Sequence, residues 1–290
     1  MDNKFAIITD MACDMPESFF KENDIDVASM PFRINGKEYG RDNAMPHDEF
    51  YDLIRAGGVP TTSQTDMADA AELFEKHLSK GEDVLYISFS GGVSGSFNNV
   101  SNIVRGEMKE KYPDRKIIVI DTLSGAAGQG LMTYYMVKMR SEGKSVEEAA
   151  EWLENNKLNF NHFYLIGDLE LLKKGGRISK TQAILGTLIG IRPLLMLDSK
   201  GKNHVVSKIR GKKKAVSALL ELTEKYCIPE NNDFIMTTHS GCLKDAEELN
   251  AALKAKFNKD VITVPLTYLV GSHCGPDTIG VFFVGHKRMA

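Results

Sequence analysis

Short apolar runs alternate with helix-patterned stretches through the first half of the chain. Runs rich in β-branched residues predict buried strands at residues 5–9, 27–32, 84–89 and 116–120. Apolar positions recur at helical spacing after Asp66, a suitable N-cap, and a second helix is expected over residues 131–139. Ser145 and Glu148 match a capping box that opens a third helix. Alternating strands and helices predict an α/β domain with a mainly parallel sheet and flanking helices.

Two turn signals refine this pattern near the N-terminus. Pro16 suits the first turn of a helix, and Asp14 lies where it could cap that helix. Asn35 and Gly36 favour a hairpin turn after the second strand, because both tolerate a positive φ.

Three of the predicted strands end in polar loops: the loop after Asp10, residues 88–96 and residues 121–125. In a parallel sheet such loops gather at one edge, where ligands commonly bind. The middle loop reads Ser-Gly-Gly-Val-Ser-Gly-Ser over residues 90–96. Glycines allow close backbone approach, and amides at a helix start favour an anion. We therefore expect hydroxyls and amides to bind a carboxylate or phosphate. An ordinary turn, with Asp10 and Asp121 accepting backbone amides, is the structural alternative.

The pattern changes near residue 158, and a second, α+β domain is predicted. Its expected elements are an apolar segment at 183–191, strands at 194–197, 234–238, 261–264 and 280–284, and helices at 215–226 and 246–257. We place the domains at residues 1–160 and 161–290.

Composition narrows the functional class. The net charge of −3, from 36 basic and 39 acidic residues, argues against a general nucleic-acid binder. No apolar run approaches the roughly 18–20 residues of a membrane span, and the N-terminus lacks a signal-peptide layout, so a cytoplasmic protein is expected. The four cysteines form no C-x-x-C pair, and neither a metal site nor a cofactor is predicted.

Seven motifs, in order along essentially the whole chain, resemble those of the DegV family of bacterial fatty-acid-binding proteins. The motifs span Asp10 to Asp14, Pro60 to Gln64, Ser90 to Ser96, Val119 to Thr122, Leu172 to Ser179, Lys208 to Gly211 and His273 to Pro276. The resemblance implies a two-domain DegV-like fold with a long-chain fatty acid buried between the domains. It also implies a role as the acyl-binding subunit of a fatty acid kinase, whose separate ATP-using subunit forms the acyl phosphate.

The resemblance also implies roles for particular residues. Thr62 and Ser94 would hold the carboxylate with their hydroxyls, and His273 would lie near the head group. Ser63 and Gly95 belong to the same two loops and are further candidates for lipid contact. Arg177 and Arg210 would contact the phosphorylated head group or the kinase. The apolar segment at 184–191 suits an acyl tunnel. Asp277 departs from the family pattern, which commonly has glycine there, and adds charge near this pocket.

Two other functions remain open at this point. A serine hydrolase or acyltransferase would use Ser94, His273 and Asp121, although the loop lacks the G-x-S-x-G spacing of a nucleophile elbow. A binder of phosphorylated metabolites would use the same loops but needs a polar pocket. No P-loop or H-E-x-x-H motif is present, so we expect a binding protein without chemistry of its own.

Overall fold

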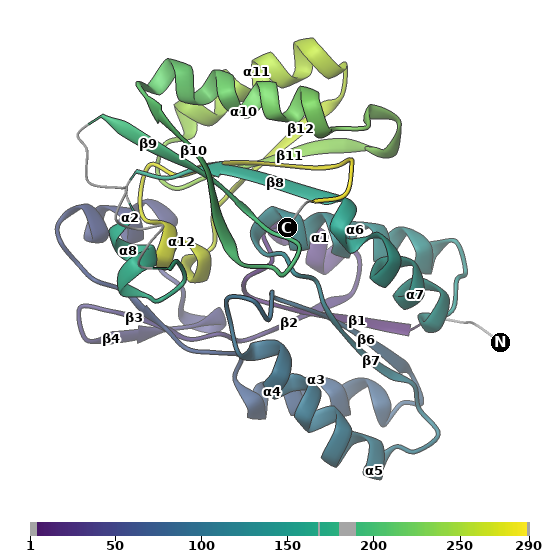
Figure 1. The fold of residues 1–290 in the computed structure, drawn as a ribbon. Helices are drawn as coiled ribbons and strands as arrows, with labels where there is room; N and C mark the ends of the chain where they lie inside the picture. The colour runs from purple at the N-terminus through teal and green to yellow at the C-terminus, as the bar shows by residue number, and fades with distance from the viewer. Residues whose placement is uncertain (1–4, 168, 180–189, 289–290) are drawn as a thin grey trace.

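Two β-sheets lie one above the other, with helices between them and on both outer faces (Figure 1). The chain is described by a computed structural model over residues 5–167, 169–179 and 190–288. Within those ranges, no helix combines the length and apolar character required to cross a membrane.

The first sheet has four parallel strands in the order β2-β1-β6-β7. Its strands are β1 (Phe5–Asp10), β2 (Ile25–Ala28), β6 (Asp83–Ser88) and β7 (Ile117–Asp121). A small antiparallel sheet, β4-β3-β5, lies beside it. It contains β3 (Phe32–Ile34), β4 (Lys37–Tyr39) and β5 (Thr61–Thr62).

The second large sheet has six strands in the order β10-β9-β8-β13-β11-β12, and only its β11–β12 pair is parallel. Its strands are β8 (Phe160–Leu165), β9 (Ile191–Leu197), β10 (Asn203–Arg210), β11 (Phe234–His239), β12 (Asp260–Pro265) and β13 (Ile279–Val284).

The helices form three layers around these sheets (Figure 1). The α-helices are α1 (Glu17–Glu22), α2 (His47–Arg55), α3 (Met67–Leu78), α4 (Ser96–Ile103), α5 (Lys109–Lys111), α6 (Ala126–Ser141), α7 (Val146–Asn156), α8 (Glu170–Lys174), α10 (Lys212–Tyr226), α11 (Leu243–Phe257) and α12 (Tyr268–Cys274). Four short helical turns complete the set: η1 (Arg41–Asn43), η2 (Val104–Met108), η3 (Lys157–Asn159) and η4 (Pro229–Asn231). Helix α6 contacts strands of both large sheets, whereas α10 and α11 cover the outer face of the second.

Strand alternation explains how the second sheet is buried on both faces. On β8, Phe160 and Tyr164 pack toward α6 and the first sheet, while Phe163 and Leu165 pack toward α10 and α11. The predicted α/β fold with a mainly parallel sheet and an α+β second half is confirmed. The boundary at residue 160 coincides with the start of β8, and we retain the division into 1–160 and 161–290 as a proposal.

Several local predictions are confirmed, and others are wrong. Asp66 caps α3 through the amides of residues 68 and 69, and Ser145 and Glu148 form the capping box of α7. The Asn35–Gly36 turn adopts positive φ at both positions. Asp14 does not cap α1. Its Oδ1 instead accepts the backbone amide of Thr267, 3.0 Å away, because Thr267, the N-cap residue of α12, lies against this loop.

Other differences concern element boundaries. The strand predicted at 27–32 is two strands, β2 and β3, which belong to different sheets and are separated by a break that contains Pro31. Helix α2, strand β10 and helix α12 were not predicted. Most of the apolar segment at 183–191 lies outside the described residues, and Ile191 begins β9.

His77 links three elements of the first half and gives a pH-dependent prediction. Its ring lies 2.6 Å from Asp26 on β2 and 2.6 Å from Glu82 before β6. The hydrogen bond to Asp26 is the largest contribution that raises the pKa of His77. A raised pKa stabilises the fold below the unfolded value of about 6.5, and this stability is lost as the pH rises through the folded pKa.

We therefore expect the unsubstituted chain to be more stable than a His77→Gln variant at pH 6, and this difference in the free energy of unfolding to shrink as the pH rises to 9. Chemical denaturation across that range checks this, with His286→Gln, at an exposed histidine, as the control. Equal slopes in the chain and the His77 variant would contradict it.

Candidate functional site

The polar loops at the ends of β1, β6 and β7 meet at one edge of the first sheet, as predicted. Asp10 accepts the amides of Phe89, at 2.9 Å, and Ala12, at 3.1 Å, and burial raises the pKa of this carboxyl to about 6. Asp121 accepts the amides of Gly91 and Leu123, each at 3.0 Å. Both carboxylates therefore shape the loops, and no cluster of three or more metal-ligating side chains occurs in the described parts of the chain.

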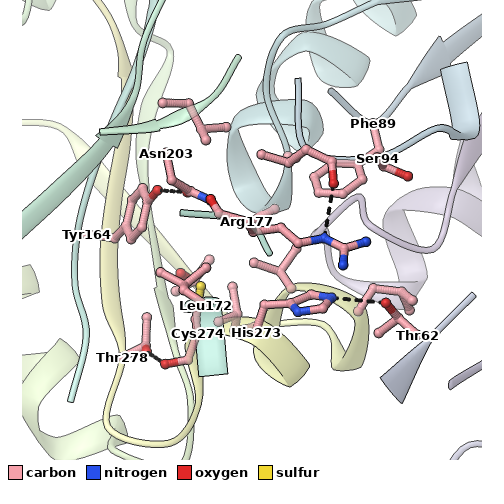
Figure 2. A pocket seen from close by; sticks show the side chains of 18 of the residues that line it. Thr62, Phe89, Ser94, Tyr164, Leu172, Arg177, Asn203, His273, Cys274 and Thr278 are labelled. Atoms are coloured by element: carbon pink, nitrogen blue, oxygen red, sulfur yellow. Dashed lines mark hydrogen bonds between the residues drawn. The ribbon is translucent and has the colours of Figure 1, made fainter. Parts of the chain in front are cut away.

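A cavity lies between these loops and the second sheet (Figure 2). It contains about 990 Å³ of space not filled by atoms, part of which is open to solvent. Its apolar wall comes from both halves of the chain. The apolar lining residues are Met30, Phe89, Val93, Ala126, Leu172, Leu197, Leu266, Leu269, Val270 and Phe282.

Thr62 and His273 meet at one end of the cavity, although 211 positions separate them in the chain (Figure 2). Thr62 ends β5, His273 lies on α12, and Oγ1 of Thr62 is 3.0 Å from Nε2 of His273. Burial, together with the nearby cation of Arg177, lowers the pKa of His273 to about 4. The imidazole is therefore neutral near pH 7.

Ser94 lines the same cavity from the Ser-Gly loop. Its Oγ lies 3.0 Å from Oγ of Ser96 and also accepts the Ser96 amide. Ser96 accepts the amide of Thr65, and Ser90 donates to the carbonyl of Gly201, 2.8 Å away. Of the three hydroxyls in this loop, Ser94 is thus the one placed at the cavity.

The other candidates from these two loops have different positions. Ser63 lines the cavity beside Thr62. Gly95 is the N-cap residue of α4 and lines a groove on the outside of the cavity. A Cβ at this position would lie 2.5 Å from Nε2 of Gln64. Gly95 therefore permits the close packing of the loops.

Arg177 links the Ser-Gly loop to the turn that follows α8 (Figure 2). Its Nε donates to the carbonyl of Val93 at 3.2 Å, and its guanidinium also donates to the carbonyl of Gly175. Arg210 lies elsewhere: it ends β10 and is exposed, about 23 Å along the strand from Asn203, which lines the cavity. The structure does not bring Arg210 to the cavity.

An outer groove continues from the cavity to the surface. The two share Val93, Ser94, Arg177 and Asn203. Glycines line much of the groove, and its charged lining residues are Arg177, Lys202 and Asp198. The glycines are Gly91, Gly92, Gly95, Gly175 and Gly176. The part of the cavity beside Ser94 therefore connects with the outer groove.

Several polar residues on the second sheet also line the cavity and were not predicted from the sequence. The hydroxyl of Tyr164 donates to the side chain of Asn203, which in turn donates to the carbonyl of Arg177 at 2.8 Å. His162, Thr238 and Thr278 complete this wall. Strand alternation could have placed Tyr164 and His162 on one face, but no sequence signal indicated which face the cavity would occupy.

The arrangement required for nucleophilic catalysis is not assembled in the described residues. Ser94 is hydrogen-bonded to Ser96, His273 to Thr62, and Asp121 to backbone amides. A base within hydrogen-bonding distance of the serine is the usual requirement for such catalysis.

The side chain of Asp277 forms an ion pair with Arg55 at 3.0 Å, on the outer side of the interface between the two halves. The negative charge of Asp277 is therefore paired with Arg55, and Asp277 is not among the residues that line the cavity.

Comparison with known proteins gives this geometry a context. A DegV family model matches residues 4–286. A DegV domain-containing protein of Clostridium perfringens is 38% identical over 288 residues, which cover 98% of this chain and 99% of that protein. A DegV domain-containing protein of Streptococcus pyogenes is 32% identical over 286 residues, with coverage of 98% and 99%.

Solved structures agree in fold. The structure described as fatty acid binding of a DegV family protein from Thermus thermophilus has a TM-score of 0.86 at 26% identity and covers 98% of this chain and 100% of that one. A fatty acid binding DegV family protein from Streptococcus agalactiae has a TM-score of 0.84 at 28% identity, with coverage of 98% and 99%. With the seven motifs in order, a matching fold and relatives across its length, the chain belongs to the DegV family.

Proposed function

We propose that this protein binds a long-chain fatty acid in the cavity between its two halves, with the carboxylate at Thr62 and Ser94. The observation that carries the proposal is a cavity with apolar walls and neutral hydroxyls at its accessible end. The fatty-acid binding described for the Thermus thermophilus and Streptococcus agalactiae relatives supports the same ligand class.

At the end of the cavity that contains Thr62 and Ser94, the proposed carboxylate meets neutral hydrogen-bond donors. When neutral His273 donates from Nε2 to Oγ1 of Thr62, the threonine hydroxyl proton is free to donate to a carboxylate oxygen. Arg177 lies close by, but its guanidinium donates to two backbone carbonyls. We propose that the hydroxyls, and not Arg177, hold the carboxylate, so that its oxygens keep the lone pairs that a bidentate arginine would occupy.

The acyl chain provides most of the affinity. Burial of about 14–16 methylenes at ~0.8 kcal/mol each gives on the order of 10 kcal/mol before the costs of association and ordering. The head-group hydroxyls then fix the orientation of the chain, with the carboxylate toward the outer groove.

We propose that the groove presents this carboxylate to a separate ATP-dependent fatty acid kinase in the cytoplasm. A carboxylate oxygen attacks the γ-phosphorus of ATP, a new P–O bond forms, the bond to the β-phosphate oxygen breaks, and ADP leaves. Arg177 and Lys202 line the groove, where they can attract the transferred phosphoryl group. Arg210, far from the cavity and exposed, is proposed to face the kinase.

Native mass spectrometry and an acyl-phosphate assay test the two parts separately. We expect the protein purified from a bacterial host to carry a long-chain fatty acid, or to take one up after delipidation. With kinase, ATP and hydroxylamine, we expect acyl hydroxamate only when this protein is present. Arg210→Ala is expected to reduce hydroxamate formation more than lipid uptake. Absence of lipid binding would overturn the whole proposal, and lipid binding without hydroxamate would overturn the kinase role.

A further inference from the structure

The inner face of the second sheet shows where the cavity ends. Antiparallel pairing of β8 with β13 sets three pairs of residues side by side on that face: Tyr164 with Gly280, His162 with Phe282, and Phe160 with Val284. Tyr164, His162 and Phe282 line the cavity, whereas Phe160 and Val284 do not. Successive inward positions on a strand are about 6.8 Å apart, so the cavity follows these strands as far as His162 and Phe282 and stops before the next pair.

Tyr164 marks the end of this face that is nearer the outer groove. Its hydroxyl donates to the side chain of Asn203, which lines both the cavity and the groove. The opposite end is filled, because Phe160 is fully buried and its ring packs against aromatic side chains of α6 and α7. His162 and Phe282 therefore form the inner end of the cavity on this sheet.

The ring of Phe282 projects along β13 toward the groove end. A Cβ at Gly280 would lie 2.7 Å from Cε2 of Phe282, and a Cβ at Gly128 on α6 would lie 3.3 Å from Cδ1 of the same ring. Glycine at both positions therefore leaves room for the ring. The side chain of Phe282 is buried among these neighbours, so packing fixes the position of this end wall.

His162 forms the other half of the wall. Its ring stacks beside Phe282, with centroids 6.2 Å apart and 29° between the ring planes. Nη1 of Arg288 lies 3.3 Å from Nε2 of His162 and also donates to the carbonyl of Leu197 at 3.0 Å. Burial and the cation of Arg288 lower the pKa of His162, so the ring is neutral near pH 7. An uncharged aromatic wall suits the methyl end of an acyl chain, because that end needs no hydrogen-bond partner.

We propose that His162 and Phe282 set the longest acyl chain that this protein binds, so that it selects saturated fatty acids by length. The inference rests on the proposed fatty-acid binding, with the carboxylate held at Thr62 and Ser94. Because the carboxylate is fixed there, each added methylene moves the chain end toward Phe282 and raises the affinity by up to about fourfold while it is buried. A longer chain must displace Phe282 or withdraw its carboxylate from the hydroxyls, so it gains nothing further.

Displacement of a fluorescent fatty acid by saturated acids of increasing length, from laurate to behenate, tests this. We expect the affinity of the unsubstituted protein to rise up to one length and then to stop rising. In Phe282→Val, which leaves space beside the chain end, this limit is expected to move to acids longer by about two carbons. Phe283→Val is the matched control, because Phe283 is also buried but lies on the opposite face of β13 and does not line the cavity. Its limit should stay unchanged.

A second variant, His162→Val, carries the test if circular dichroism shows that Phe282→Val does not fold. An affinity that keeps rising through behenate in the unsubstituted protein would overturn the inference and leave fatty-acid binding intact. An unmoved limit in either folded variant, or an equal shift in Phe283→Val, would also overturn it. Failure of every acid to bind would instead overturn the proposed function.

Discussion

A Thr62→Val, Ser94→Ala double variant is expected to bind long-chain fatty acids on the order of 100-fold more weakly than the unsubstituted protein. A hydrogen bond to a charged group contributes about 1.5–3 kcal/mol, and the two hydroxyls together are proposed to hold the carboxylate. Each side chain is partly exposed at the cavity end, so the substitutions remove hydroxyls without opening the core. Equilibrium binding of a fluorescent fatty acid, displaced by stearate, measures the loss.

Thr61→Val is the matched control for this variant. Thr61 precedes Thr62 on β5, is exposed and does not line the cavity, so its change should leave the affinity within about twofold of the unsubstituted value. Unchanged affinity in the double variant would remove both hydroxyls from the site. A loss of the same size in Thr61→Val would indicate a general effect on the β5 loop.

A Val270→Trp variant is expected to lose at least 100-fold in affinity for the acyl chain while it keeps nearly all of its stability. Val270 lies on α12, is half-buried and lines the cavity, so an indole at this position would occupy space that the chain needs. In a filled core the same change would overpack its neighbours and cost about 1–3 kcal/mol. Ligand displacement and urea denaturation of the same samples measure the two effects.

Val206→Trp provides the control, because Val206 is 37% exposed on β10 and is not a lining residue. We expect both affinity and stability to stay close to the unsubstituted values. Retained binding in Val270→Trp would mean that the acyl chain does not occupy the cavity. A large loss of stability in that variant would mean that the space around Val270 is already filled.

The loops at the sheet edge could be predicted from the sequence because they depend on local signals. Each follows an apolar strand, and parallel strands bring their ends to one edge. Asp10 and Asp121 illustrate the limit of that reasoning: their position after a strand was clear, but only the structure assigns their oxygens to the amides of nearby loops.

Contacts between distant segments could not be predicted from spacing alone. The approach of Thr62 to His273 depends on how α12 packs beside β5, and the sequence supplied it only through the resemblance to the DegV family. The prediction that Arg210 contacts the head group or the kinase also came from the resemblance to the DegV family. Arg210 ends strand β10, which was not predicted from the sequence, and lies far from the cavity. The position of the Phe282 ring against α6 depends on that helix lying between the two sheets, which no local pattern specifies.

A crystal structure of the protein with bound stearate tests the central claim most directly. The account predicts continuous density for an extended acyl chain through the cavity between the halves, with carboxylate oxygens within hydrogen-bonding distance of Thr62 and Ser94. An empty cavity with the acid bound elsewhere, or a chain in the reverse orientation with its carboxylate away from these hydroxyls, would contradict it.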